Sequence, residues 1–283
     1  MSMADEAYRA CQNAARAQAQ ATGKPVATDA VLTRHALESF LHRLTLTEHA
    51  DSFVLKGGAL LAAYDYRRTT RDVDSNAVAV DLTAGHVEQI TRDLAQVEAN
   101  DGVDFETDSI RVETIREGAG YPGLRMRIQA MIATWRGVVA WDISTGDPIV
   151  PAPRTITIDR VIGEPIRMLG YSVEMIIAEK GVTILERGST STRWRDYVDI
   201  VQLCSRGFDS NELRRSAAAV AQYRQVALGP VGPHLADYDD SGQRRWAAWR
   251  RKEDHEDDSD ESLEAQLALV ARYLDPVFER DRT

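Results

Sequence analysis

The stretch 56–74, KGGALLAAYDYRRTTRDVD, concentrates residue types that can handle phosphate groups and metal ions. It closes with Asp72 and Asp74, two carboxylates separated by one residue. Alternate residues of a β-strand point to the same face, so both carboxylates would lie on one side, about 6.6 Å apart along the chain. Mg²⁺ prefers carboxylate oxygens and is often held by one or two of them together with substrate phosphates. The pair therefore predicts a metal site, with Mg²⁺ as the expected ion and Mn²⁺ as the alternative.

A Gly-Gly pair, Gly57 and Gly58, precedes the two aspartates and follows the short apolar run 53–55. Glycines let a backbone approach a phosphate closely, and free amides at a helix start attract its charge. Taken alone, the pair is typical of a tight strand-to-helix turn, Asp-x-Asp is typical of solvated loops, and Lys56 is typical of a surface lysine. Their combination favours a site for a phosphate and a metal ion.

A third carboxylate, Asp142, falls in the apolar run 138–143, VVAWDI. Such a run predicts a central strand that is buried on both faces. A buried carboxylate is costly unless it is paired or coordinates a metal. Asp142 is therefore a candidate third metal ligand from a neighbouring strand. The alternative is that it lies at the end of the strand and caps a turn towards Gly146.

Two further sets of charged residues lie in the helical second half of the chain. Lys180 and Arg187 are seven residues apart and share one helix face. From there both could reach a triphosphate. Asp196 and Asp199, three residues apart, also share a face. The alternative for this second pair is surface ion pairing, for example between Arg195 and Asp199.

Around these residues the sequence predicts an α/β fold, with an N-terminal α/β domain over 1–165 and a C-terminal helical domain over 166–283. Helices are expected over 1–20, 30–49 (with Thr28 as a cap), 59–66, 81–99 and 263–278, and strands over 53–55, 71–80, 109–115, 124–132, 137–143 and 154–158. The acidic run 252–261, KEDHEDDSDE, predicts a solvated linker.

Composition excludes several classes of protein. The sequence contains no apolar stretch long enough to span a bilayer, and its first residues do not resemble a signal peptide. Two cysteines cannot make a disulfide framework, so we expect a cytoplasmic protein. The net charge is −10, but residues 234–283 hold 14 acidic and 8 basic residues and so account for −6 of it. Charge therefore neither supports nor excludes a nucleic-acid substrate.

Taken in order, these motifs resemble the AbiEii/AbiGii-type nucleotidyltransferase toxins, including the mycobacterial MenT group, whose core has the polymerase-β-like nucleotidyltransferase fold. The resemblance covers about 53–203. The matching segments are Gly57-Gly58 with 70–74 (TRDVD), 141–143 (WDI), 178–180 (AEK) with Arg187, and 195–200 (RDYVDI). One departure is Gly181 directly after Lys180, because glycine weakens a helix by ~1 kcal/mol relative to alanine.

The resemblance implies roles for individual residues. Asp72 and Asp74 would bind Mg²⁺, with Asp142 on the third carboxylate strand, and Asp196 would be the essential late aspartate. The nucleotide-binding set would be Gly57, Gly58, Thr70, Arg71, Lys180 and Arg187. Arg71, with Arg67 and Arg68 beside it, is also placed to grip the backbone of an RNA acceptor.

The resemblance also implies an activity and partners. The substrate would be an NTP, with pyrimidines preferred, and the nucleotide would be transferred to the 3′ acceptor end of tRNA, which blocks translation. An antitoxin that phosphorylates Thr70, two residues before Asp72, would be the partner. Two alternatives remain open: a nucleotide-binding sensor or docking module without turnover, and a nucleotidyltransferase that modifies a small molecule such as an antibiotic.

Overall fold

A computed structural model of the chain describes residues 1–78, 82–115, 123–188, 193–236, 238 and 240–279. The chain divides into two compact units, one formed by Met1–Asp147 with Arg154–Gly170 and the other by Pro148–Pro153 with Tyr171–Thr283. The residues where the strand predicted over 71–80 would end and the next predicted helix would begin, 79–81, lie outside the described residues.

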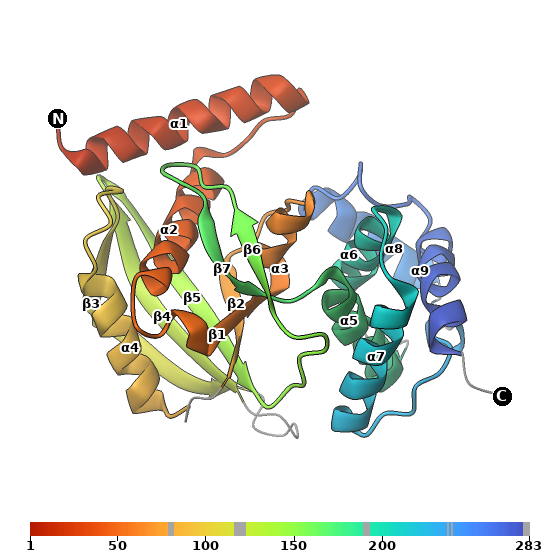
Figure 1. The fold of residues 1–283 in the computed structure, drawn as a ribbon. Coiled ribbons are helices and arrows are strands. Elements are labelled where there is room, and N and C mark those ends of the chain that lie inside the picture. The colour runs from red at the N-terminus through yellow and green to blue at the C-terminus, as the bar shows by residue number, and fades with distance from the viewer. Residues whose placement is uncertain (79–81, 116–122, 189–192, 237, 239, 280–283) are drawn as a thin grey trace. The chain divides into compact units, whose positions relative to one another are not determined.

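The first unit is built around a mixed sheet (Figure 1). Its seven described strands have the order β3-β4-β5-β2-β1-β7-β6. The strands are β1 (Phe53–Lys56), β2 (Asp72–Ala77), β3 (Asp104–Ile115), β4 (Gly123–Ile132), β5 (Trp135–Thr145), β6 (Arg154–Ile158) and β7 (Ile166–Gly170). β2 pairs with β1 in antiparallel and with β5 in parallel orientation, so it lies inside the sheet.

The helices of this unit are α1 (Met3–Thr22), α2 (Thr28–Thr45), the single turn α3 (Gly57–Leu60) and α4 (Ala84–Gln96). Phe40 of α2 contacts Trp141 of β5, with ring centroids 5.3 Å apart. Trp141 in turn contacts Phe53 of β1, at 4.6 Å. These rings mark the sheet face that α2 covers. Residues of the alternate positions, including Asp72, Asp74 and Asp142, therefore point to the opposite face.

The second unit is helical. Its helices are α5 (Val173–Arg187), α6 (Trp194–Ser205), α7 (Ser210–Arg224), α8 (Asp240–Lys252) and α9 (Leu263–Phe278). An aromatic cluster joins α6 to α8: Trp246 lies 5.6 Å from Trp194 and stacks on Trp249 at 5.2 Å. None of the described helices of either unit combines the length and apolarity that a membrane span requires.

Most predicted elements are confirmed, although several bounds differ: β3 begins at Asp104 rather than 109, β5 spans Trp135–Thr145 rather than 137–143, and α4 ends at Gln96 rather than 99. β6 and α9 have the predicted bounds, whereas β7 was not predicted. Thr28 is the first residue of α2 rather than its cap; the cap position is Ala27, whose side chain cannot accept a hydrogen bond. The second helix ends at Thr45 rather than 49, and the stretch 59–66 forms a single α-turn followed by a 3₁₀ turn over Leu61–Tyr64.

The prediction of a solvated acidic linker is wrong for part of 252–261. His255 is only 4% exposed, and its ring stacks on Trp249 at 4.8 Å. Arg250 is buried and donates hydrogen bonds to the carbonyls of Glu256 and Ser259. One buried guanidinium thus orders the segment against α8, because it satisfies backbone carbonyls that would otherwise require water.

Gly181, the departure from the family pattern, has a packing reason. A Cβ at this position would lie 2.7 Å from Cζ of Phe278, a ring of α9. The absence of a side chain therefore lets α9 approach α5. The close approach compensates for the low helix propensity of glycine.

We predict that Gly181→Ala destabilises the protein by about 1–3 kcal/mol, because Phe278 must shift from its packed position. Helix propensity alone would give a gain of ~1 kcal/mol. Denaturant unfolding measures the difference. The matched control is Gly85→Ala in α4, where a Cβ meets no atom within 4 Å and a small gain or no change is expected. A stabilised Gly181→Ala protein would contradict the packing argument.

Candidate active site

Four charged residues form a row across the sheet on the face opposite α2. In the strand register, Lys56 lies opposite Asp74, Asp74 opposite Asp142, and Asp142 opposite Arg125. Residues opposite each other on adjacent strands point to the same face. Within this row a cation flanks the two carboxylates on each side, and Glu113 of β3 lies beyond Arg125. This order offsets the repulsion between the two neighbouring carboxylates.

Asp72 lies in the next row, opposite Ala140 of β5. Val73, between the two aspartates of β2, is fully buried. The prediction that Asp72 and Asp74 share one face of a strand is confirmed by this register. β2 thus presents two carboxylates on the side of the sheet away from the Trp141 core.

The Gly-Gly turn seats Asp74. Gly57 has φ +67°, and a Cβ built on it would lie 1.9 Å from Oδ2 of Asp74. Only glycine lets this carboxylate lie against the turn, and only glycine adopts this φ without strain. The following helix, α3, is a single turn of four residues, so the contribution of the Gly-Gly pair is chiefly steric rather than that of a long helix dipole.

Thr70 and Gly58 belong to the same neighbourhood. The hydroxyl of Thr70 donates a hydrogen bond to Oδ1 of Asp72, at 2.9 Å. A Cβ on Gly58 would lie 2.7 Å from Oγ1 of Thr70. The second glycine therefore gives Thr70 the space in which it reaches Asp72. Arg71, between Thr70 and Asp72, is exposed.

Asp142 is held by Arg125, a residue that the sequence analysis did not select. The guanidinium donates from Nε to Oδ1 at 2.6 Å and from Nη2 to Oδ2 at 2.5 Å. The side-chain hydrogen bonds that Arg125 donates to Asp142 raise the pKa of Arg125 above its ordinary value. Asp142 lies inside β5 rather than at its end, so the alternative of a turn cap is wrong. The pairing accounts for the buried carboxylate.

Lys56 is not the surface lysine that its type alone suggests. Lys56 is only 8% exposed, and its Nζ lies 3.4 Å from Oδ2 of Asp147, which is also buried. The carbonyl of Asp147 accepts a hydrogen bond from Nδ2 of Asn76 on β2, at 2.9 Å. Lys56 therefore supplies a buried positive charge on the same side of the sheet as Asp74. Its pattern in the sequence, a lysine after an apolar run, carries no signal of this.

Asp72 and Asp74 fit the coordination that Mg²⁺ commonly has in nucleotide enzymes, in which one or two carboxylates act together with substrate phosphates and water. Within the described residues, no group of three acidic, histidine or cysteine side chains lies close enough to hold a metal ion. Both oxygens of Asp142 already accept hydrogen bonds from Arg125. The predicted role of Asp142 as third ligand stays a prediction.

The second unit contains the other candidate cluster, between α5 and α6. Nζ of Lys180 lies 2.5 Å from Oδ1 of Asp196 and 2.9 Å from Oδ2 of Asp199. Arg193 also pairs with Asp196, whereas Arg195 pairs with Glu253. The alternative of a surface pair between Arg195 and Asp199 is therefore wrong. Asp196 and Asp199 share a face of α6, as the spacing predicted.

Asp196 is strongly stabilised as an anion. Burial by itself would raise the pKa of its carboxyl, but the charges of Lys180 and Arg193 outweigh this and lower it to about 2. Arg187 is the last residue of α5 and is exposed, whereas Lys180, on the same helix, is largely buried. The two basic residues thus differ in how far they reach solvent.

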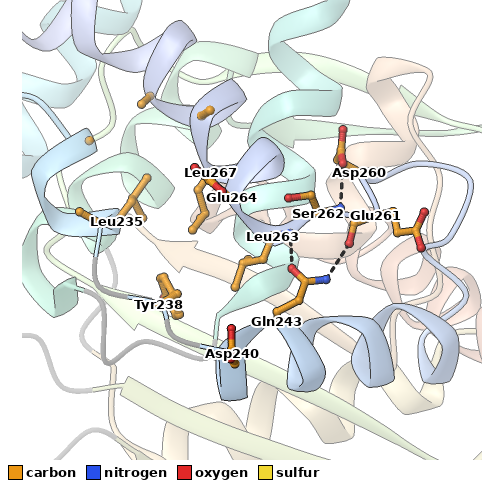
Figure 2. Close-up of a pocket in the computed structure, with 14 residues that line it drawn as sticks. Leu235, Tyr238, Asp240, Gln243, Asp260, Glu261, Ser262, Leu263, Glu264 and Leu267 are labelled. Atoms are coloured by element: carbon orange, nitrogen blue, oxygen red, sulfur yellow. Dashed lines mark hydrogen bonds between the residues drawn. The ribbon is translucent and has the colours of Figure 1, made fainter.

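A pocket of about 1020 Å³ lies in the second unit, between α8, α9 and the segment before α8 (Figure 2). Its apolar wall includes Leu235, Leu263 and Leu267, and its polar lining includes the carboxyl-bearing residues Asp240, Asp260, Glu261 and Glu264. Its described lining contains none of the candidate site residues and no lysine or arginine. Its charge would repel a triphosphate, so we do not assign the nucleotide to it.

Comparison with known proteins decides the family. The family model described as nucleotidyl transferase AbiEii toxin, Type IV TA system, matches residues 39–269. The chain belongs to this AbiEii family. It is therefore a nucleotidyltransferase of a toxin–antitoxin system, and the match extends well beyond the stretch that carries the sequence motifs. A search of curated proteins gives no match for this AbiEii chain.

Two solved structures from Helicobacter pylori share the fold of this AbiEii protein. A Helicobacter pylori protein described as a nucleotidyltransferase is 14% identical, with TM-score 0.55 and coverage of 89% of this chain and 96% of that one. JHP933 from the same species is 14% identical, with TM-score 0.53 and coverage of 88% and 91%. MenT4, a nucleotidyltransferase toxin from Mycobacterium tuberculosis, is 17% identical, with TM-score 0.49 and coverage of 86% and 94%.

The close contact between Gly57 and the Asp74 carboxylate leads to one prediction. Gly57→Ala should move the Asp74 carboxylate, since a methyl group would occupy its place, and should strain the left-handed backbone by ~1–2 kcal/mol. We expect weaker binding of Mn²⁺, measured by electron paramagnetic resonance, in a protein that remains folded by circular dichroism. The control is Gly85→Ala, which leaves the site untouched. Unchanged Mn²⁺ binding in Gly57→Ala would contradict the steric role.

The ion pairs of Asp196 generate a pH prediction. Because its pKa is lowered from 3.8 to about 2, its contribution to stability is complete above about pH 4 and is lost as the pH falls through about 2. Asp196→Asn should abolish this part of the acid dependence, on the order of 2 kcal/mol. Urea unfolding over this pH range measures it, with exposed Asp51→Asn as the control. Equal pH profiles of wild type and Asp196→Asn would contradict the assignment.

Proposed function

We propose that this nucleotidyltransferase toxin uses Mg²⁺ to transfer a nucleotide from an NTP, preferably a pyrimidine, to the 3′ acceptor end of tRNA, and so blocks translation in the cytoplasm. The observation that carries the proposal is the pair Asp72 and Asp74 on one face of β2, with the Gly57 turn against Asp74. The family supplies the reaction class, and the carboxylate pair supplies the place where it would occur.

The first unit would hold the reacting centre. Asp72 and Asp74 would hold the metal, with Asp142 as the proposed third ligand. Bound Mg²⁺ neutralises charge on the phosphates of the NTP and activates the attacking hydroxyl. Thr70 orients Asp72 through its hydroxyl, at 2.9 Å. Lys56 and Arg125, on either side of Asp74 and Asp142 in the register, offset the charge of these carboxylates.

The second unit contains further residues of the proposed nucleotide set. Lys180 would bind the phosphates of the nucleotide, and the proposed nucleotide set is completed by Arg187, Thr70, Arg71 and the two glycines Gly57 and Gly58. Asp196 and Asp199 fix the position of Lys180 at 2.5 and 2.9 Å. The positive charges would stabilise the pyrophosphate that leaves when the 3′-hydroxyl of the acceptor bonds to the α-phosphorus.

An antitoxin partner is implied by the Type IV toxin–antitoxin family. We propose that it acts by phosphorylating Thr70. The hydroxyl of Thr70 donates to Asp72, and a phosphate there would replace this donor by a group of about −1.5 to −2 charge. Repulsion from the metal-binding carboxylates would misplace Asp72, which explains how a single modification could silence the site.

The test is incorporation of labelled nucleotide into RNA. Purified protein is incubated with Mg²⁺, total tRNA and each labelled NTP in turn. We expect label in tRNA with wild type, and a loss of about 100-fold or more in kcat for Asp72→Asn and Asp74→Asn, since each removes a ligand of the essential ion. Lys180→Met should also lower activity, and the control is Arg92→Gln on α4, a half-exposed residue that pairs with Glu88.

The outcomes separate the proposal from its alternatives. Full activity in Asp72→Asn would overturn the metal assignment. Binding of NTP with no labelled acceptor in cell extracts would identify a sensor module instead. Label that enters an aminoglycoside but not tRNA would identify a small-molecule nucleotidyltransferase.

A further inference from the structure

Three arginines lie beyond the carboxylates on the same face of the sheet. Arg125 and Arg127 are two residues apart on β4, and Arg111 of β3 lies directly opposite Arg127. Across β5, Asp142 lies opposite Arg125 and Ala140 opposite Arg127. The row Asp72–Ala140–Arg127–Arg111 therefore leads from the candidate active site across β5 and β4 to β3. We name Arg111, Arg125 and Arg127 the arginine strip.

The arginine strip is open to a ligand. The side chain of Arg127 is 44% exposed and that of Arg125 is 32% exposed. Arg125 uses Nε and Nη2 for Asp142, and no described residue accepts a hydrogen bond from its Nη1. Arg111 and Arg127, like charges directly opposite on neighbouring strands, destabilise the sheet unless an anion lies between them. Glu113, which lies opposite Arg125 in the register, pairs with Arg127 and offsets only part of this charge. Nη1 of Arg111 donates hydrogen bonds to the carbonyls of Asp108 and Ile110.

The surface between the carboxylates and the arginine strip is low and partly apolar. Ala140, between Asp72 and Arg127 in the row, has the smallest side chain that keeps a Cβ. Val138, two residues earlier on the same face of β5, is 50% exposed, which is unusual for an apolar strand residue. A chain that crosses β5 here would meet a small residue under its backbone and an apolar side chain beside it.

The geometry of nucleotidyl transfer indicates which substrate approaches the carboxylates from the side of the arginine strip. In an in-line displacement, the attacking hydroxyl and the leaving pyrophosphate lie on opposite sides of the reacting phosphorus. The Gly57 turn and Lys56 flank Asp74 on the β1 side, whereas the arginine strip lies on the other side, on β4 and β3 beyond β5. If the nucleotide phosphates occupy the first side, the acceptor must enter over the second.

We propose that the sugar–phosphate backbone of the acceptor RNA binds along the arginine strip, with its 3′ end directed at Asp72 and Asp74. Three strand spacings of about 4.8 Å separate β2 from β3, so the path is about 14 Å long and accommodates more than one phosphate. Arginine forks suit such groups. Asp142 is then a positioning residue for Arg125 as well. This inference rests on the proposed function, because it assumes an RNA acceptor.

Direct binding tests the arginine strip without any turnover. The probe is a fluorescein-labelled RNA hairpin with a single-stranded CCA 3′ end, and its binding is followed by fluorescence anisotropy in chelator over a range of salt concentrations. The variants are Arg111→Gln, Arg127→Gln and the double variant, with Arg92→Gln as the matched control. Arg125 is left in place, because its removal would leave Asp142 buried without its partner.

We expect about tenfold weaker binding by the double variant. The slope of log K against log salt should become shallower by about 0.7–0.9 for each RNA phosphate that the variant no longer neutralises. The KM for RNA should rise while kcat and the KM for NTP stay unchanged. Arg92→Gln should match wild type in all of these.

The outcomes distinguish this inference from the proposed function. Wild type that labels tRNA, together with variants that bind and label it equally well, would overturn the arginine strip and leave the function in place. Arginine-dependent binding of the hairpin without transfer of any nucleotide would support the strip and overturn the function. Absence of hairpin binding by wild type would overturn the strip.

Discussion

Two carboxylates placed side by side on neighbouring strands, Asp74 and Asp142, impose the main physical constraint on the first unit. Like charges at opposite positions of a sheet repel, and Asp142 is buried. Arg125 on one side and Lys56 on the other provide the compensating charges, and Gly57 leaves room for the Asp74 carboxylate. The apolar residues of the same strands face α2, so one face of the sheet packs in a hydrophobic core and the opposite face carries the charged residues.

In the second unit, too, buried charges are compensated by neighbouring opposite charges. Here one cation, Lys180, lies between Asp196 and Asp199, and Arg193 adds a further charge beside Asp196. The result is an acid whose pKa is lowered to about 2 although it is buried. The same ion pairs fix the position of Lys180 between the two carboxylates.

Much of the negative charge of the chain lies in its C-terminal part. The acidic run before α9 is ordered by Arg250, whose guanidinium binds two of its carbonyls, and by His255 stacked on Trp249. Four acidic residues line the pocket beside α9. Acidic residues thus gather in the last part of the second unit, whereas the arginine strip lies in the first. A net charge of −10 therefore does not argue against an anionic substrate.

Short-range periodicity in the sequence was enough to predict β6, α9 and the shared face of Asp72 and Asp74, because a period of two or 3.6 residues is a property of one element alone. The partners of these residues could not be predicted this way. Arg125 meets Asp142 only because β4 and β5 pair in one register, and a shift of one residue would turn Arg125 to the other face. Lys56 is buried beside Asp147, which is distant in the sequence. His255 is buried because its loop folds back and stacks the ring on Trp249. The sequence by itself determined the family motifs and the spacing of the candidate residues. The tertiary structure decided which charges compensate them, because strand register and burial are set by long-range packing.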